Sequence, residues 1–205
     1  MVYYRETTTM ISDLVLSACS FVAGTMRMNR MRAYSWRYAT IGWFGMFGFS
    51  FIGFAAFLGF LRFGYFFPRR QHSLESWHKY FTALASIIGL PMIAAAYTQR
   101  TEYQNLCWMF LVLSIISTLL HCIEALHVAV RDFCAVVSVL FVIISAVFME
   151  YRGQVNRYSL AGSCCFIFAT IVSDQGRGFQ GIKNVDLFHY FLSVGVCLLS
   201  EGLLL

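Results

Sequence analysis

Two short patterns of titratable residues stand out in a sequence that otherwise has few of them. The first is His121-x-x-Glu124-x-x-His127, and the second is Asp186-x-x-His189. On a continuous helix, residues three apart lie on one face, so the first pattern would present two imidazoles and a carboxylate together. Such a face could serve a metal site or a proton relay. In the second pattern, Asp186 could hold the His189 ring in one tautomer, as a carboxylate does for a metal ligand or a general base.

A plainer interpretation of each pattern stays open. The first pattern falls at the end of a predicted apolar helix, where its side chains could reach lipid head groups or pair with nearby charged residues. In the second, Asp186 could cap the N-terminus of a helix and favour its dipole. His189 would then be a buried imidazole that is satisfied by one hydrogen bond.

Asp13 is a third position of interest because it lies inside the first apolar stretch. A carboxylate at membrane depth is costly unless it is paired or wetted, so its partner must come from another helix or from water. If the last helix packs beside the first, Asp13 and His189 would lie within hydrogen-bond reach. The candidate polar residues are therefore Asp13, His121, Glu124, His127, Asp186 and His189, and a metal, if one binds, would be held by His121, His127 and His189.

The composition places these residues in a membrane protein. Apolar residues make up 59% of the 205 residues and charged residues only 12%, about half the share in soluble domains. Such a chain is too apolar to be disordered and cannot bury its apolar surface around one water-soluble core. A membrane-spanning helix needs about 20 largely apolar residues. Seven segments meet this test, at residues 8–26, 39–61, 81–98, 105–126, 133–149, 158–173 and 185–204.

The sequence thus predicts an all-α, polytopic membrane protein, a single bundle of about seven transmembrane helices over residues 1–205. Lys and Arg in the connections divide eight to seven between the two sides, so they specify no orientation, and the membrane of residence is not specified either. The expected partners are the lipid bilayer and other membrane subunits. The net charge of +5 lies on the flanks of the spans, and no basic, water-exposed face indicates nucleic-acid binding.

Familiar catalytic and structural motifs are absent. The seven cysteines have no C-x-x-C or paired spacing, which argues against a zinc knuckle and a disulfide framework. There is no G-x-S-x-G, no H-E-x-x-H and no phosphate-binding glycine loop. No reaction is therefore indicated by a motif alone.

The two ends of the chain resemble an uncharacterised family of seven-span membrane proteins. That family is similar in architecture to the superfamily of alkaline ceramidases, adiponectin-receptor-like proteins and related membrane hydrolases. The resemblance is carried by Glu6-Thr7-Thr8-Thr9, by Ile11-Ser12-Asp13-Leu14 and by Asn184-Val185-Asp186-Leu187-Phe188-His189.

For the hydrolases of that superfamily, the resemblance implies a zinc ion held by a His in the second span and two His one turn apart in the seventh. A Ser in the second span and an Asp in the third would support them. Here the second span has no His, the third has no Asp, and the position one turn after His189 is Ser193. The resemblance supports the fold and counts against the reaction, because one ligand cannot hold catalytic zinc.

The sequence therefore favours a non-catalytic multi-pass protein without a cofactor. It would be a structural or accessory subunit of a membrane assembly, or a degenerate relative of the membrane hydrolases. The alternative is a metal-dependent hydrolase of a lipid amide or ester within the membrane. That enzyme would need zinc in a site rebuilt from the candidate polar residues.

Overall fold

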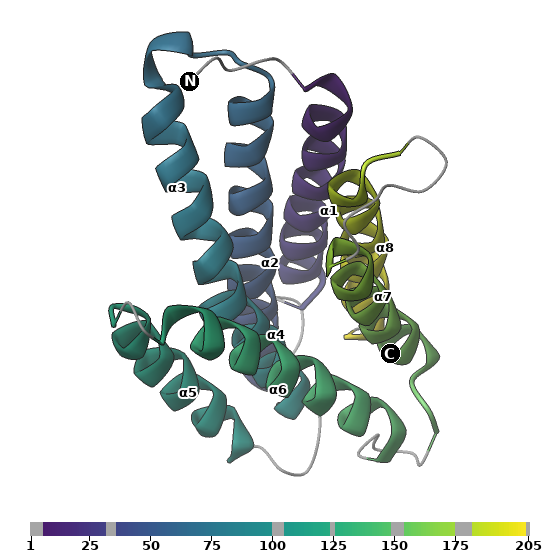
Figure 1. Ribbon diagram of the computed structural model, residues 1–205. Helices are drawn as coiled ribbons and strands as arrows, with labels where there is room; N and C mark the ends of the chain where they lie inside the picture. Colours follow the sequence, from purple (N-terminus) through teal and green to yellow (C-terminus); the bar gives the residue numbers. More distant parts are fainter. Residues whose placement is uncertain are drawn as a thin grey trace.

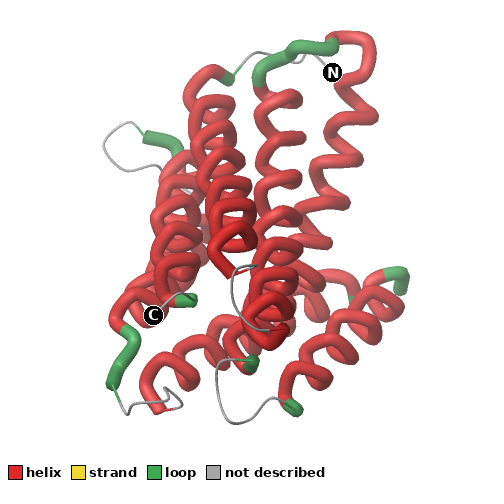
Figure 2. Tube along the Cα trace, turned by 180° about the vertical axis from the view of Figure 1, so that it is seen from behind, coloured by secondary structure: helices red, strands yellow, loops and turns green. Residues whose placement is uncertain are grey.

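Every regular element in the described part of the computed structural model is a helix (Figures 1 and 2). The structure describes residues 6–31, 36–99, 105–123, 126–148, 154–174 and 182–203. The elements are α1 (Thr7–Met31), α2 (Trp36–Phe63), η1 (Pro68–Arg70), α3 (Gln71–Leu84), η2 (Ala85–Gly89), α4 (Leu90–Thr98), α5 (Leu106–His121), α6 (His127–Phe148), α7 (Arg157–Asp174) and α8 (Asn184–Gly202). The predicted all-α class is confirmed.

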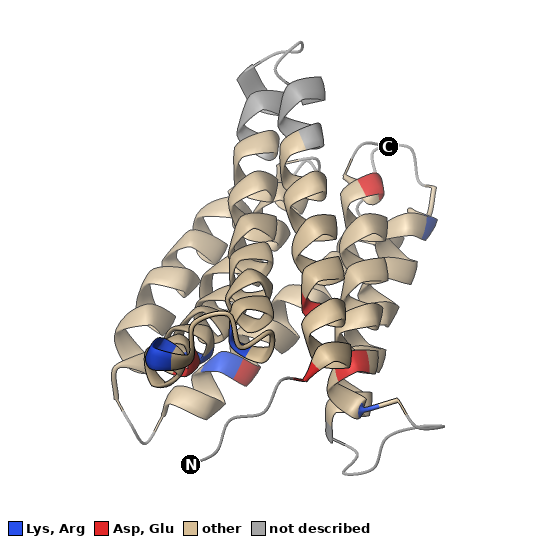
Figure 3. Cartoon of the chain, turned by 90° about the horizontal axis from the view of Figure 1, so that it is seen from above, with Lys and Arg blue, Asp and Glu red and all other residues tan. Residues whose placement is uncertain are grey.

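Five helices in the described part are long and apolar enough to cross a membrane: Thr7–Thr25, Gly42–Phe63, Pro68–Thr98, His127–Phe148 and Asn184–Gly202. Two shorter apolar helices, Leu106–His121 and Arg157–Ser173, complete the set. Charged residues gather toward the ends of the helices, whereas the middle stretches are mostly free of them (Figure 3). These are the lengths and the charge distribution of a membrane protein.

Two helix boundaries differ from the sequence-based expectation. The third predicted segment began at residue 81, but the helix begins at Pro68, because residues 71–80 are too polar for a hydropathy criterion and still form an amphipathic helix. The fourth was expected to continue to residue 126, but α5 ends at His121. The amides of Cys122 and Ile123 bond to carbonyls three residues back, which tightens the last turn before α6 folds back.

The helices pack as a chain of neighbours in which the first and last described helices meet (Figure 1). α1 packs against α2 and α8, and α8 packs in turn against α7. α2 packs against α3 and α4, and α4 contacts α5 and α6. The core lies around α4, where residues 93–97 are buried together with Phe49 of α2 and Val196 of α8.

The helix from Pro68 to Thr98 contains a π-helical stretch, Ala85–Gly89, immediately before Pro91. Proline has no amide hydrogen to give to the preceding turn, and a π-turn is one way in which a helix accommodates that loss. Gly89 also meets α2, since a Cβ at Gly48 would lie 2.7 Å from its carbonyl oxygen. Small residues thus let the backbones of α2 and α4 touch.

Candidate functional site

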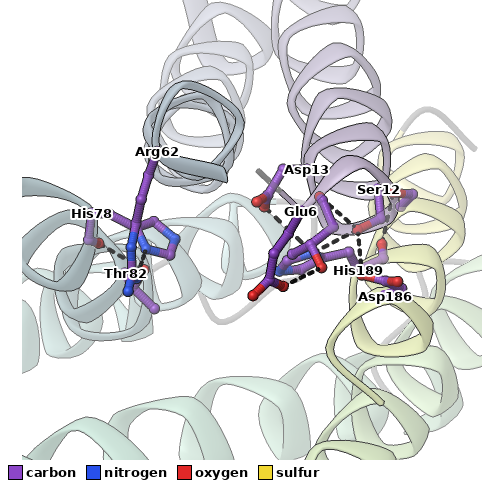
Figure 4. A network of polar contacts seen from close by, with 10 residues as sticks. Glu6, Ser12, Asp13, Arg62, His78, Thr82, Asp186 and His189 are labelled. Carbon is purple, nitrogen blue, oxygen red and sulfur yellow. Dashed lines mark hydrogen bonds and ion pairs between the residues drawn. The ribbon is translucent and has the colours of Figure 1, made fainter. Parts of the chain in front are cut away.

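The interface of α1 and α8 carries two facing rows of polar side chains. On α1 and just before it, Glu6, Thr9 and Asp13 follow helical spacing, and Ser12 lies next to Asp13. At the start of α8, Lys183, Asp186 and His189 recur every three residues. Such spacings put each row on one face of its helix. Packing of α1 on α8 brings the two rows together (Figure 4).

The centre of this interface, here called the α1–α8 cluster, consists of Ser12, Asp13, Asp186 and His189. Ser12 Oγ lies 3.1 Å from Nδ1 of His189 and 3.4 Å from Oδ1 of Asp186. Asp13 Oδ1 lies 3.4 Å from the same Nδ1 atom. The four residues expose only 0%, 0%, 2% and 7% of their surfaces, so the cluster is closed to bulk solvent.

Asp13 is the least satisfied member of the cluster. Among the residues that the structure describes, none donates a hydrogen bond to either carboxylate oxygen, and the contact with the His189 ring is the 3.4 Å approach given above. On the other side the carboxylate packs against α2, since a Cβ at Gly59 would lie 2.7 Å from Asp13 Cγ. A buried polar group without a donor is rare and calls for an explanation.

An ion pair lies beside the cluster, at the start of α1 and the start of α8. Lys183 Nζ lies 2.7 Å from Oε2 of Glu6, and both side chains are about half exposed. The hydroxyl of Thr9 donates to the same Glu6 oxygen at 3.4 Å. The amide of Glu6 donates to the carbonyl of Phe63 at 3.0 Å, which joins the start of α1 to the end of α2.

The cluster contains Ser, His and Asp, but not in the arrangement of a catalytic triad. In a triad the serine uses one ring nitrogen and the carboxylate holds the other. Here Ser12 and Asp13 both meet Nδ1 of His189. Ser12 also donates to the carbonyl of Thr9 at 3.0 Å. The arrangement links two helices.

The structure brings together three of the six candidate residues, Asp13, Asp186 and His189, and the hypothesised contact of Asp13 with His189 is present. His121 ends α5 and His127 begins α6, so they do not share one continuous helix as expected. Their ring centroids are still 5.9 Å apart. Glu124 lies outside the described residues.

The expected metal ligands do not converge. The end of α5 and the start of α6 lie on the other side of the bundle from α8 (Figure 1). His121 is the last residue of α5, His127 is the first of α6, and His189 belongs to α8. In the part of the chain that the structure describes, no group of three or more His, Cys, Asp or Glu side chains is placed to hold a metal ion. The residue one turn after His189, Ser193, donates its hydroxyl to the backbone carbonyl of His189 at 2.8 Å.

Sequence reasoning missed Ser12, Gly59 and the pair of Glu6 with Lys183. Ser12 carried a usable signal, because it precedes Asp13 directly inside an apolar helix. Gly59 carried none, since α2 contains several glycines and only packing distinguishes them.

A comparison with models of protein families assigns this helical chain to one family. Residues 8–204 match a family of unknown function (DUF6962), and the chain belongs to that family. The matched range contains all four residues of the α1–α8 cluster. Neither a curated protein nor a solved structure matches the chain.

Proposed function

We propose that the chain is a non-catalytic, seven-span integral membrane protein. It would be a structural or accessory subunit of a membrane assembly, or a degenerate relative of the membrane hydrolases. The observation that carries this proposal is that Ser12 and Asp13 meet the same nitrogen of His189. The most reactive set of residue types in the chain is thus arranged as a link between helices.

The seven-span architecture is supported by the two shorter apolar helices. α7 has 18 residues, within the range of about 17 to 25 residues for spanning helices, and α5 has 16, one residue short of that range. Both carry large apolar side chains on their outward faces, for example Trp108 and Leu119 of α5, which are 69% and 67% exposed. Such faces suit lipid and the apolar surfaces of neighbouring subunits.

The proposal of a non-catalytic role is also supported by the lack of fit to zinc. A catalytic zinc site normally has three protein ligands and one open position. His189 is one suitable ligand, but the hydroxyl of Ser193 is directed to its own helix backbone. On the other side of the cluster, Gly59 of α2 packs directly against the carboxylate of Asp13.

As a link between helices, the cluster has a clear physical role. It ties α1 to α8 through contacts that no local sequence can provide. Polar contacts between helices in a membrane contribute about 0.6 kcal/mol each on average, and up to roughly 1.7 kcal/mol. Several such contacts in one buried cluster would hold the two helices in one register.

One specific observation favours a second candidate function, the metal-dependent hydrolase of a lipid amide or ester. Asp13, Asp186 and His189 are chemically able to bind a metal ion, and they lie in one buried cluster in which Asp13 lacks a hydrogen-bond donor. Their positions do not form a ligand group.

One purification distinguishes the two candidates. The full chain, extracted in mild detergent, is expected to elute with a partner subunit at fixed stoichiometry and without stoichiometric zinc. His189→Ala is the test variant, and His72→Ala, which changes an exposed imidazole, is the matched control. A lone, monodisperse monomer would contradict the accessory role. One zinc ion per chain, lost in His189→Ala but retained in His72→Ala, together with release of fatty acid from lipid amides or esters, would establish the hydrolase instead.

A further inference from the structure

The turn between α2 and α3 forms an open pocket whose lining combines aromatic and cationic side chains. Phe66, Phe67, Pro68, Arg69 and Arg70 enclose about 370 Å³. Phe66 and Phe67 are about half exposed although they are large and apolar. Both arginines are exposed.

The conformation of this turn is fixed by its backbone and by a side-chain hydrogen bond. The backbone of Tyr65 is left-handed, with φ of 56°, just after α2 ends. Pro68 then begins the next helical segment at a position that suits its fixed φ. The side-chain amide of Gln71, which is buried, donates to the carbonyl of Arg62 at 3.3 Å and so ties the new helix to the end of α2.

The pocket lies where a membrane would place its head groups. The turn that lines it connects two of the membrane-length helices, from the end of Gly42–Phe63 to the start of Pro68–Thr98. The second of these has 31 residues, roughly ten more than the hydrocarbon layer requires, so its first turns extend beyond that layer. The exposed rings of Trp77 and Tyr80 follow on the same helix, and such rings are enriched at the membrane–water interface.

No acidic side chain of the described residues balances the positive charge of the pocket. The neighbouring cations Arg62 and Lys79 both pair with Glu75, at 3.3 Å and 2.8 Å. Within the described residues, no ion pair or hydrogen bond is found for the side chains of Arg69 and Arg70. Two adjacent guanidinium groups repel each other, and an anion placed between them relieves that repulsion.

We propose that this pocket binds the head group of an anionic phospholipid. The two guanidinium groups would hold the phosphate, because their planar forks match its oxygens in pairs. Phe66 and Phe67 would contact the glycerol and the upper acyl chains. The inference rests on the membrane location in the proposed function, and it is independent of whether the α1–α8 cluster is catalytic.

Native mass spectrometry of the detergent-solubilised full chain tests the proposal, with phosphatidylglycerol and phosphatidylcholine as probes. We expect phosphatidylglycerol to bind more tightly than phosphatidylcholine. A basic residue near an anionic membrane surface contributes about 5-fold in affinity. The double variant Arg69→Gln/Arg70→Gln should therefore bind phosphatidylglycerol about 25-fold more weakly, at two such factors. It should lose clearly less affinity for phosphatidylcholine, because the choline cation already balances the charge of that phosphate. Arg131→Gln, which changes an exposed arginine paired with Asp132 on α6, is the matched control and should bind as the unmodified chain does.

Three results would overturn the proposal. One is equal binding of phosphatidylglycerol by the double variant and the unmodified chain. The second is an equal loss in Arg131→Gln, which would indicate nonspecific attraction to net charge. The third is displacement of phosphatidylglycerol by inorganic phosphate at equal concentration, which would mean that the pocket takes a free anion. If lipid binding fails this test, the measurements of the partner subunit and of zinc are unaffected. The lipid-binding proposal and the proposed function can therefore be refuted independently.

Discussion

Ser12 Oγ lies 3.1 Å from Nδ1 of His189, although 177 positions separate the two residues in the chain. The contact joins α1 to α8 at a depth where neither side chain reaches bulk water. The register of α1 against α8 therefore depends on this contact, and the contribution of the contact to the free energy of unfolding can be measured.

A double-mutant cycle on Ser12→Ala and His189→Ala should show coupling. We expect the free energies of unfolding to be non-additive by about 1 kcal/mol, because each substitution removes the same contact. The measurement is thermal or SDS unfolding of the purified chain. His189→Asn should recover part of the loss, since its amide can lie close to the position of Nδ1. A control cycle with Ser114→Ala, whose hydroxyl bonds within α5, should be additive. Additivity of Ser12→Ala with His189→Ala would disprove the link.

Asp13→Asn should stabilise the chain. The carboxylate of Asp13 is buried, and no donor from the described part of the chain reaches it. An unsatisfied buried group costs about 1–3 kcal/mol, more when it is charged. Asparagine keeps the volume and cannot carry a charge. The midpoint of thermal unfolding is expected to rise, whereas Asp132→Asn, an exposed change on α6, should leave it nearly unchanged. A lower midpoint for Asp13→Asn would show that the carboxylate is required for stability.

Gly59→Ala should destabilise the chain by displacing Asp13. The added Cβ would lie 2.7 Å from Asp13 Cγ and 2.9 Å from its Oδ1. Overpacking of this kind typically costs 1–3 kcal/mol. Gly45→Ala on the same helix is the matched control, because its Cβ would make an ordinary contact at 3.4 Å with Leu203. Combining Gly59→Ala with Asp13→Ala should restore stability. If the combination is as unstable as Gly59→Ala alone, the clash does not involve the carboxylate.

Glu6→Gln should have a small effect that depends on salt. The ion pair of Glu6 with Lys183 is about half exposed, and exposed pairs contribute roughly 0–1 kcal/mol. The unfolding midpoint should fall slightly at low ionic strength, and the difference should shrink at high ionic strength as the charges are screened. Lys183→Met should behave in the same way, and the two changes together should cost no more than either one. A large loss that does not respond to salt would mean that Glu6 acts through its other contacts.

Most of the helices could be predicted from the sequence because a membrane imposes a simple requirement on length and polarity. The start at Pro68 could not, since residues 71–80 are polar enough to hide a helix that extends beyond the apolar layer. The end of α5 at His121 could not be predicted either. No proline or glycine marks it, and the turn is set by the packing of α5 on α6 and α4.

Part of the site could be predicted from the sequence because the helices are so apolar. Asp13, Asp186 and His189 are noticeable because titratable residues are rare in such apolar helices. Their convergence depends on α1 packing beside α8, which no local pattern specifies. Ser12 was overlooked because small hydroxyl residues are frequent in these helices and usually bond to their own backbone.

The pairing of α1 with α8 also sets an order for biosynthesis. α1 leaves the ribosome long before α8 is made, so Asp13 enters the bilayer while Asp186 and His189 do not yet exist. Until translation reaches residue 184, its carboxylate must be wetted or shielded by the insertion machinery. Completion of the bundle is therefore a late event, and a ribosome that stalls before that point leaves a nascent chain in which Asp13 has not yet met α8.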